Sequence, residues 1–457
     1  MKVFILGFLC LLLLQPIAAQ QVSDYQQTAD SIVEKARTSE LGWARLSTIC
    51  TLYPHRLSGT TALEEAIDWV LEEMEADGFD RVTTQEVIVP HWERGVERLT
   101  VLKEKPEELT VMALGGSVST PAEGIEAELL VVESYEELDQ RREEARGKIV
   151  VFNVPFTTYG ETVGYRITGA SRAADAGAVA ALLRSVTPNS LATPHTGVMY
   201  YDKESNKVPF GAITPEAAMH FHRLQEKGVK VKVRLVLETR EYPDAVSRNV
   251  IAEIRGSEYP EEVIVLGGHI DGWDIGEGAH DDAGGCLMTW EALRILKDLG
   301  LKPKRTIRVV LWTNEENGLQ GARAYRDLQD LELKNHVLAI ESDYGTFHPT
   351  GYAFSGQKKA LETLQEVLGL LKDSVGEMSV RTPGGGADIG PLMKEGVPGA
   401  ALTHQSERYF WYHHSPADTL DKIDQEDFRN CVATLAVTVY VVADLPTRLP
   451  FGIPEDK

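Results

Sequence analysis

Histidine and acidic residues recur at five places in the second half of this chain, and most of them directly follow an apolar run. These places are residues 267–271, 278–282, 314–318, 341–343 and 413–418. Imidazoles and carboxylates arranged in this way can hold a pair of divalent metal ions and leave one glutamate free for proton transfer. The pattern indicates a metal-dependent hydrolase.

The first two places offer a histidine ligand and a bridging carboxylate. His269 follows the apolar run 263–266, and Asp271 is spaced to accept its second ring N–H, which would fix the tautomer. Asp281 and Asp282 stand at the start of a predicted helix, where acids usually serve as caps. We predict that Asp281 bridges the metals through its two oxygens and that Asp282 is a cap.

The next places supply the remaining ligands and a base. Glu315 and Glu316 follow the apolar run 307–312, and adjacent residues at a bend can point in different directions. We predict Glu316 as a ligand and Glu315 as the general base that takes a proton from the attacking water and passes it to the leaving amine. Asp343 is a further ligand candidate.

A pair of histidines lies farther along the chain, in a loop. Either His413 or His414 could complete the second metal site, and we favour His414. Asp418 comes shortly before a helix predicted at residues 425–442. It is interpreted as a cap or as a support for the ligands rather than as a ligand.

The elements that must position these side chains alternate between strand and helix. Strands are predicted at residues 250–254, 263–266, 307–312 and 337–340, with a helix at 286–299. Continuous apolar strands alternating with helices indicate an α/β fold with a largely parallel sheet covered on both faces. Functional groups gather beyond the carboxyl ends of such strands, where the candidate ligands lie.

The first half of the chain reads differently. A polar stretch covers residues 20–37. A helix follows, with capping-box spacing of Thr61 and Glu64 and an end at Gly78, and then a strand at 82–89.

Residues 96–241 are predicted to form an inserted domain rich in β-strands. Its strands are expected at 129–132, 148–152 and 231–237, with an alanine-rich helix at 171–183. His195, His220 and His222 lie in it without forming a ligand cluster. The predicted organisation is therefore residues 1–19, 20–95, 96–241 and 242–457.

Residues 1–19 are predicted to be a signal peptide. Lys2 precedes an apolar stretch that is too short for a membrane span and ends in small residues. We therefore expect a secreted or periplasmic protein without a membrane partner. Cys50, Cys286 and Cys431 remain in the mature chain, with buried free thiols at least as favoured as one bridge.

The amino-acid composition and the net charge limit the kinds of binding partner that this chain can have. Hydrophobic content of 43% and charged content of 25% are ordinary for a globular protein. The net charge of −23 argues against nucleic acid, because a phosphate backbone requires a basic surface.

The order and the amino-acid sequences of these segments resemble the motifs of the M28 family of metallopeptidases, and within it those of the carboxypeptidase Q-like branch. The matching stretches are residues 267–274, 278–285, 312–318, 341–347 and 384–392. Residues 54–59 resemble an early segment of the family, with His55 where proline is expected. The likeness covers nearly the whole mature chain.

This resemblance implies a zinc-exopeptidase α/β/α sandwich with a mostly parallel mixed sheet, and a protease-associated domain in the inserted stretch. It also implies two Zn²⁺ per chain. One would be held by His269, Asp281 and Asp343, and the other by Asp281, Glu316 and His414. Glu315 would be the base and Asp271 the support of His269. Short peptides would be the substrates, and the branch suggests a homodimer.

The family motifs leave the direction of cleavage open. A carboxypeptidase needs a cation for the substrate carboxylate, for which Arg56, Arg240 and Arg381 are candidates. An aminopeptidase needs an acid, for which Asp388 and Glu341 are candidates.

The expected activity is that of a carboxypeptidase or dipeptidase, with an aminopeptidase of the same family as the alternative. Two further alternatives are a glutaminyl cyclase, which uses one zinc for acyl transfer, and a binding protein without catalysis. A bridging acid together with His269 favours two metals and hydrolysis over both.

Overall fold

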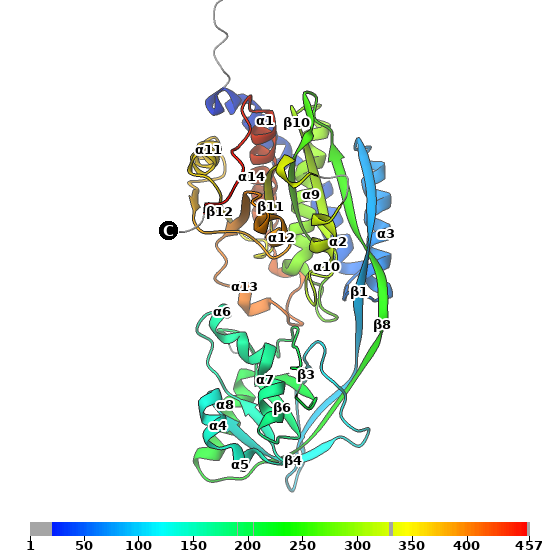
Figure 1. The fold of residues 1–457 in the computed structure, drawn as a ribbon, viewed down its shortest axis with the longest axis vertical. Coiled ribbons are helices and arrows are strands. Elements are labelled where there is room, and N and C mark those ends of the chain that lie inside the picture. The colour runs from blue at the N-terminus through cyan, green and yellow to red at the C-terminus, as the bar shows by residue number, and fades with distance from the viewer. Residues whose placement is uncertain (1–20, 190, 204, 329–331, 455–457) are drawn as a thin grey trace, which may run out of the picture.

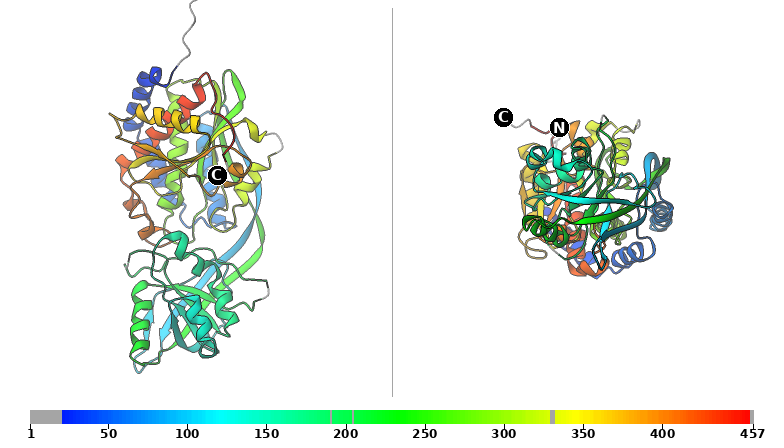
Figure 2. Two further views of the ribbon diagram at one scale, coloured as in Figure 1. Left: turned by 60° about the vertical axis from the view of Figure 1, so that its left-hand side comes forward. Right: turned by 90° about the horizontal axis from the view of Figure 1, so that it is seen from below.

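The computed structural model describes residues 21–189, 191–203, 205–328 and 332–454, which fold into two lobes (Figures 1 and 2). The large lobe comprises residues 21–89 and 245–454, and the small lobe comprises residues 97–237. Two long antiparallel strands, β1 (Arg81–Val101) and β8 (Lys232–Ile254), run through both lobes. The signal peptide predicted at residues 1–19 lies outside the described residues.

The large lobe is built on a sheet with the strand order β13-β12-β14-β11-β9-β10-β8, with β1 beside β8. The bounds are β9 (Tyr259–His269), β10 (Arg305–Trp312), β11 (His336–Glu341), β12 (Pro349–Ser355), β13 (Ser379–Arg381) and β14 (Gly399–His404). The central strands β10, β9, β11 and β14 are parallel, whereas β8 and β12 run antiparallel to their central neighbours. The prediction of an α/β fold with a large, mostly parallel mixed sheet is confirmed.

Helices cover both faces of this sheet, so its central strands are buried on both sides. One face packs against α1 (Gln26–Thr38), α2 (Leu41–Leu52), α3 (Thr61–Ala76), α9 (Gly284–Asp298), α11 (Lys358–Gly369) and α14 (Gln425–Asp444). The opposite face packs against α10 (Gln320–Arg326) and α12 (Gly390–Lys394). In β9, Ile264 and Leu266 join the first core while Val263 and Val265 join the second, as the alternation of a strand requires.

The small lobe has its own cores on either side of a sheet. Its strands are β2 (Glu107–Leu109), β3 (Val111–Ala113), β4 (Ile125–Val132), β5 (Ile149–Phe152), β6 (Ala180–Arg184) and β7 (Phe210–Ile213). Its helices are α4 (Tyr135–Gln140), α5 (Arg142–Ala145), α6 (Tyr159–Thr162), α7 (Gly164–Asp175) and α8 (Pro215–Glu226). Strands β4 to β7 are parallel to one another. The expected borders of the inserted domain at 96 and 241 fall inside β1 and β8, which pass from one lobe into the other.

Two expectations about helices are wrong. The alanine-rich helix expected at 171–183 is instead α7, which ends at Asp175, followed by β6. Gly177 adopts a φ of +83° between them, a backbone conformation that favours glycine. The run 180–183 is fully buried between neighbouring strands, and periodicity alone cannot separate such a run from a helix.

The N-terminal part also differs from its prediction. The polar stretch 20–37 contains α1, whose buried residues Ala29, Ile32, Val33 and Ala36 form one helical face. Helix α3 is capped by Thr60 rather than Thr61, since the Thr60 hydroxyl accepts the N–H of Leu63. Glu64 makes an ion pair of 2.9 Å with Arg248 in place of a capping box.

Cys50, Cys286 and Cys431 are buried and free, so these three thiols act as small apolar side chains. Among the described residues, no helix combines the length and apolar character needed to cross a membrane.

We expect the folded protein to lose stability in acid, because two imidazoles of the large lobe are buried. Burial lowers the pKa of His336 to about 4 and of His404 to about 3, so both are neutral in the folded protein. The unfolded chain takes up these protons below about pH 6.5, so folding becomes less favourable as the pH falls from there toward 4. At about pH 4.5 each imidazole should cost roughly 2–3 kcal/mol.

The variant His404→Leu isolates one of these contributions, because neither ring nitrogen of His404 has a hydrogen-bond partner. Its melting temperature should fall less steeply than that of the wild type between pH 7 and pH 4.5. Parallel curves for the two proteins would contradict the assignment.

Candidate metal centre

Three parallel strands bring the predicted site residues to one edge of the large sheet. Strand β9 ends at His269, β10 ends just before residues 313–316, and β11 ends just before Asp343. Because β10 and β11 flank β9 in parallel, their carboxyl ends meet. The loop after β9 returns through a turn at residues 279–283 into α9, which places Asp281 over this edge.

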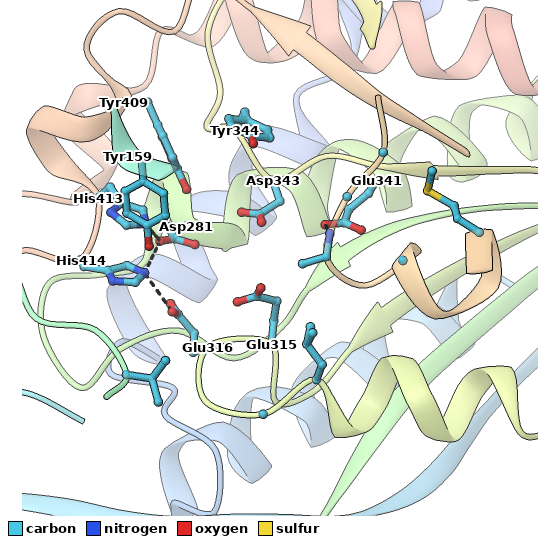
Figure 3. A pocket seen from close by; sticks show the side chains of 18 of the residues that line it. Tyr159, Asp281, Glu315, Glu316, Glu341, Asp343, Tyr344, Tyr409, His413 and His414 are labelled. Carbon is cyan, nitrogen blue, oxygen red and sulfur yellow. Dashed lines mark hydrogen bonds and ion pairs between the residues drawn. The ribbon is translucent and has the colours of Figure 1, made fainter. Parts of the chain in front are cut away.

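The carboxylate of Asp281 lies beside His413 and His414 (Figure 3) and also contacts His269. Its Oδ1 is 3.1 Å from His269 Nε2, which is also 3.4 Å from Asp343 Oδ1. Its Oδ2 is 3.2 Å from His414 Nε2, which is also 3.0 Å from Glu316 Oε2. Each oxygen of Asp281 therefore lies next to an imidazole that also contacts a second carboxylate, as expected of a bridge between two cation sites.

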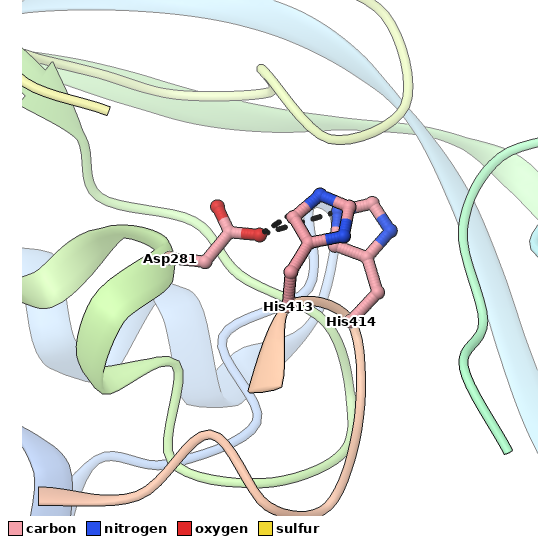
Figure 4. A group of neighbouring side chains, drawn as sticks. All are labelled: Asp281, His413 and His414. Carbon is pink, nitrogen blue, oxygen red and sulfur yellow. Dashed lines mark ion pairs between the residues drawn. The ribbon is translucent and has the colours of Figure 1, made fainter. Parts of the chain in front are cut away.

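The two neighbouring histidines differ in their reach (Figure 4). Asp281, His413 and His414 have donor atoms close enough to share a metal ion, as do His269, Asp281 and Asp343. However, His413 Nε2 lies 3.7 Å from Asp281 Oδ2, and its ring stacks on that of His414 with centroids 3.6 Å apart. Only His414 contacts both Asp281 and Glu316, so the geometry favours it as the donor.

Several potential metal-ligand atoms of this group are buried and have no hydrogen-bond partner among the described residues. They are His269 Nε2, Asp281 Oδ2, Glu316 Oε1 and Asp343 Oδ1. Buried polar atoms normally have hydrogen-bond partners. Nitrogen and oxygen atoms that converge without such partners therefore need an explanation, which a bound metal ion would supply. Nitrogen and oxygen ligands of this kind suit zinc and related divalent ions, so the residues fit metal of this class.

The electrostatics of the site also favour bound cations. Burial, together with the carboxylates of Asp343, Glu316 and Asp281, raises the pKa of Glu315 well above its usual range. Burial and Asp281 raise the pKa of Glu316 to about 7. Cations bound among these buried carboxylates would favour their ionised forms.

Asp271 supports the site in a different way from the one expected. His269 Nδ1 donates to the backbone carbonyl of Asp271 at 3.0 Å, whereas its carboxylate is 3.8 Å away. The carboxylate instead accepts the backbone N–H groups of Glu315 and Glu316 at 3.1 and 3.3 Å, and the hydroxyl of Ser58 at 3.1 Å. Asp271 therefore orients His269 with its backbone and the Glu315–Glu316 bend with its side chain.

Two further acids hold the turn that carries Asp281. Asp282 accepts the N–H groups of His269 and Gly285, both at 3.0 Å, so it joins the end of β9 to the first turn of α9, although Ala283 occupies the cap position of this helix. Asp418 accepts the N–H groups of His280 and Asp281 at 2.7 and 3.1 Å. It supports the site without capping α14, whose cap is Asp424.

The arginines singled out in the sequence do not face the site. Arg56 is buried and donates to the carbonyls of Ile270, Glu277 and Gly278 at 2.9–3.0 Å, so it fixes the loop after β9. Arg240 is exposed and stacks over Tyr242. Neither Arg240 nor Arg381 lines the cleft above the metal centre.

That cleft has a volume of about 840 Å³ and is formed by both lobes. Tyr159 and Arg166 come from the small lobe, whereas Tyr409, Glu341 and Arg323 come from the large lobe. Arg166 is buried and donates to the hydroxyl of Tyr159 at 3.0 Å. No local pattern marks Tyr159 or Arg166, because their place in the cleft depends on how the two lobes pack.

Comparisons with known proteins show the family of this chain. The profile of Peptidase family M28 matches residues 249–439. Carboxypeptidase Q of Xenopus laevis is 44% identical over 433 residues, which cover 94% of this chain and 92% of the relative.

Solved structures resemble the fold as well. The structure of a peptidase M28 precursor from Shewanella amazonensis has a TM-score of 0.90 and 32% identity, and it covers 95% of this chain and 100% of its own. A zinc aminopeptidase from Bacillus subtilis shares the fold at 19% identity, with a TM-score of 0.65 and coverage of 90% of this chain and 94% of its own.

The fold, the donor set and these comparisons define the protein as a metallo-exopeptidase. The chain belongs to peptidase family M28, and over nearly its whole length it is similar to carboxypeptidase Q.

Proposed function

We propose that this protein is an exopeptidase with two zinc ions that hydrolyses short peptides. His269, Asp281 and Asp343 would hold one ion, and Asp281, Glu316 and His414 the other. The observation that carries the proposal is the Asp281 carboxylate, whose two oxygens lie 3.1 and 3.2 Å from the two imidazoles. Zinc is supported by the two imidazoles and by the similarity to a zinc aminopeptidase.

When bound, the zinc pair would supply Lewis acidity to the scissile carbonyl and to the attacking water. The chain itself moves the proton. Glu315 lines the cleft beside Glu316 and would take a proton from the water and deliver it to the leaving amine. Asp271 holds the backbone of both glutamates, which keeps the base and the ligand pointing in different directions.

A carboxypeptidase or dipeptidase fits the charges of the cleft better than an aminopeptidase does. Arg166 is the buried cation among the described arginines and lysines that line it, since Arg323 and Lys394 are exposed. The Nε of Arg166 is buried and has no hydrogen-bond partner among the described residues, and Arg166 lines the cleft, so we propose that its guanidinium pairs with the substrate carboxylate. Glu341 also lines the cleft, but both of its oxygens accept backbone N–H groups, from Ala387 and Ile389.

Replacing this arginine should therefore affect one class of substrate. Arg166→Met should lower kcat/KM for dipeptides with a free carboxylate by about 10–100-fold, because a hydrogen bond to a charged group is worth about 1.5–3 kcal/mol. The same dipeptides with an amidated end should lose less, and the metal content of the variant is measured as well, because Nη1 of Arg166 lies 3.2 Å from Nδ1 of the proposed ligand His414. Arg323→Met is the matched control on the exposed rim, and an equal loss on both substrates would contradict the anchor.

The overall proposal is tested by the metal content of the purified protein together with a panel of dipeptides blocked at either end. Two zinc ions per chain and cleavage that requires a free carboxylate are expected. A requirement for a free amine alone would make the enzyme an aminopeptidase. One zinc with acyl transfer would indicate a glutaminyl cyclase, and no metal with no cleavage would indicate a binding protein.

Three further features are proposed on the basis of the resemblance. The stretch 96–241 would be a protease-associated domain between the parts 20–95 and 242–457 of the peptidase domain, and the small lobe is consistent with this division. The predicted signal peptide at residues 1–19 supports export to the periplasm or the medium. A homodimer would be the assembled form.

A further inference from the structure

The small lobe contacts the segment that carries His413 and His414 through its backbone. The N–H of Thr196 donates to the carbonyl of His414 at 2.9 Å, and Nδ1 of His195 lies 2.6 Å from the carbonyl of His413. The hydroxyl of Thr187 donates to the carbonyl of Phe410 at 2.7 Å. His195 and Thr196 thus contact the two adjacent carbonyl groups of His413 and His414, and Thr187 contacts the helix just before them.

These contacts act on a backbone that needs support. His414 has a φ of +57°, a conformation that residues other than glycine seldom adopt unless their surroundings enforce it. The Nδ1 of His414 lies 3.3 Å from the carbonyl of Thr196 and 3.2 Å from Nη1 of Arg166, so two residues of the small lobe contact this imidazole. A metal-binding histidine usually donates its second ring N–H in this way, which fixes its tautomer.

The stretch that contains His195 and Thr196 is itself firmly held within the small lobe. The N–H of His195 donates to the hydroxyl of Ser185 at 2.8 Å. The hydroxyl of Thr196 donates to the carbonyl of Ala113 at 2.9 Å and accepts from Arg94 at 3.2 Å. His195 is only 4% exposed. The contact is therefore a rigid one, made between two well-packed elements.

The chemistry of His195 is also defined by its partner. A carbonyl oxygen can only accept, so Nδ1 of His195 must carry the proton. Burial lowers the pKa of His195 to about 4, which agrees with a neutral ring in the folded protein. A neutral imidazole with its proton on Nδ1 is a fixed donor aimed at the backbone between the two histidines.

We propose that His195 is a positioning residue for the second metal site: it holds the His413 carbonyl so that His414 faces Asp281 and Glu316. This inference rests on the proposed zinc pair, and it assigns to the small lobe a part in building that site. In the described part of the chain, no hydrogen bond or ion pair joins His195 to His269, Asp281 or Asp343, so the first site should be independent of it.

The experiment compares three variants of the full chain, prepared without metal. His195→Phe fills the space but lacks the donor, whereas His195→Asn places an N–H at the position of Nδ1. His220→Ala changes an exposed histidine of the same lobe and is the control. The two zinc dissociation constants of each protein are measured by competition with a chromophoric chelator, and the metal-free melting temperatures are recorded.

Wild-type protein should bind two zinc ions. In His195→Phe one of the two dissociation constants should rise by about 10–100-fold, the usual effect of removing a group that orients a ligand. The other should stay unchanged, and His195→Asn and His220→Ala should resemble the wild type.

Unchanged constants in His195→Phe, or equal weakening of both ions, would overturn the inference. Weak binding in His195→Asn equal to that in His195→Phe would do so as well, because the donor would then be irrelevant. A wild-type protein that binds fewer than two zinc ions would instead refute the proposed function, so the two failures are distinguishable.

Discussion

Glu315→Gln should lower kcat by about 10³-fold while both metal ions stay bound, because general-base catalysis contributes roughly 10²–10⁴-fold. Glutamine keeps the shape of the side chain but cannot take up a proton at neutral pH. The backbone N–H of Glu315 would still donate to Asp271 at 3.1 Å, so the bend that carries Glu316 should be preserved. The expected defect is therefore confined to proton transfer.

The neighbouring residue supplies the matched control. Glu316→Gln replaces a proposed ligand, 3.0 Å from His414, by a neutral amide, so it should lose one metal ion as well as activity. Metal content and kcat are measured for both variants. Activity close to wild type in Glu315→Gln would show that another group takes the proton, and loss of metal from that variant would make Glu315 a ligand.

The convergence of the metal centre was predictable because it depends on one simple rule of α/β sheets. The candidates follow β9, β10 and β11, and parallel neighbours must end at the same edge. Residues at three distant positions in the chain could therefore be assigned to one place. The general α/β architecture follows from the same buried, alternating strands.

Details that depend on local competition between partners were not predictable. Asp271 lies two residues from His269, and the spacing alone cannot show that its carbonyl, rather than its carboxylate, receives the ring N–H. Glu64 has the spacing of a capping box but pairs with Arg248, which is distant in sequence. In both cases a tertiary contact outweighs the local pattern.

Contacts between the two lobes cannot be predicted from a single sequence. Arg166 and His195 belong to a stretch without any ligand pattern, yet Arg166 lines the cleft and His195 contacts the histidine loop. Their positions follow from the long strands β1 and β8, which run out of the large lobe and place the small lobe beside it (Figure 1). The strands could be recognised in pieces, but their continuity through both lobes could not.

Asp281→Asn should disturb both metal sites at once, because Asp281 is the residue common to the two proposed ligand sets. A neutral amide offers one oxygen where the carboxylate offers two, each facing its own imidazole at 3.1 and 3.2 Å. The turn around it should persist, since Asp418 would still accept its backbone N–H. Because the metals act on both the carbonyl and the water, kcat/KM should fall by at least about 10⁴-fold.

Single-site variants make this result specific. Asp343→Asn and His414→Ala should each weaken one zinc ion and leave the other, whereas Asp281→Asn should weaken both, as measured by metal content after dialysis against a chelator. His413→Ala should retain both ions, because its Nε2 is 3.7 Å from Asp281 and no ion pair joins it to Glu316 among the described residues. If His413→Ala loses an ion while His414→Ala keeps it, the ligand is His413. If Asp281→Asn loses only one ion, the carboxylate belongs to a single site and the metals are not bridged.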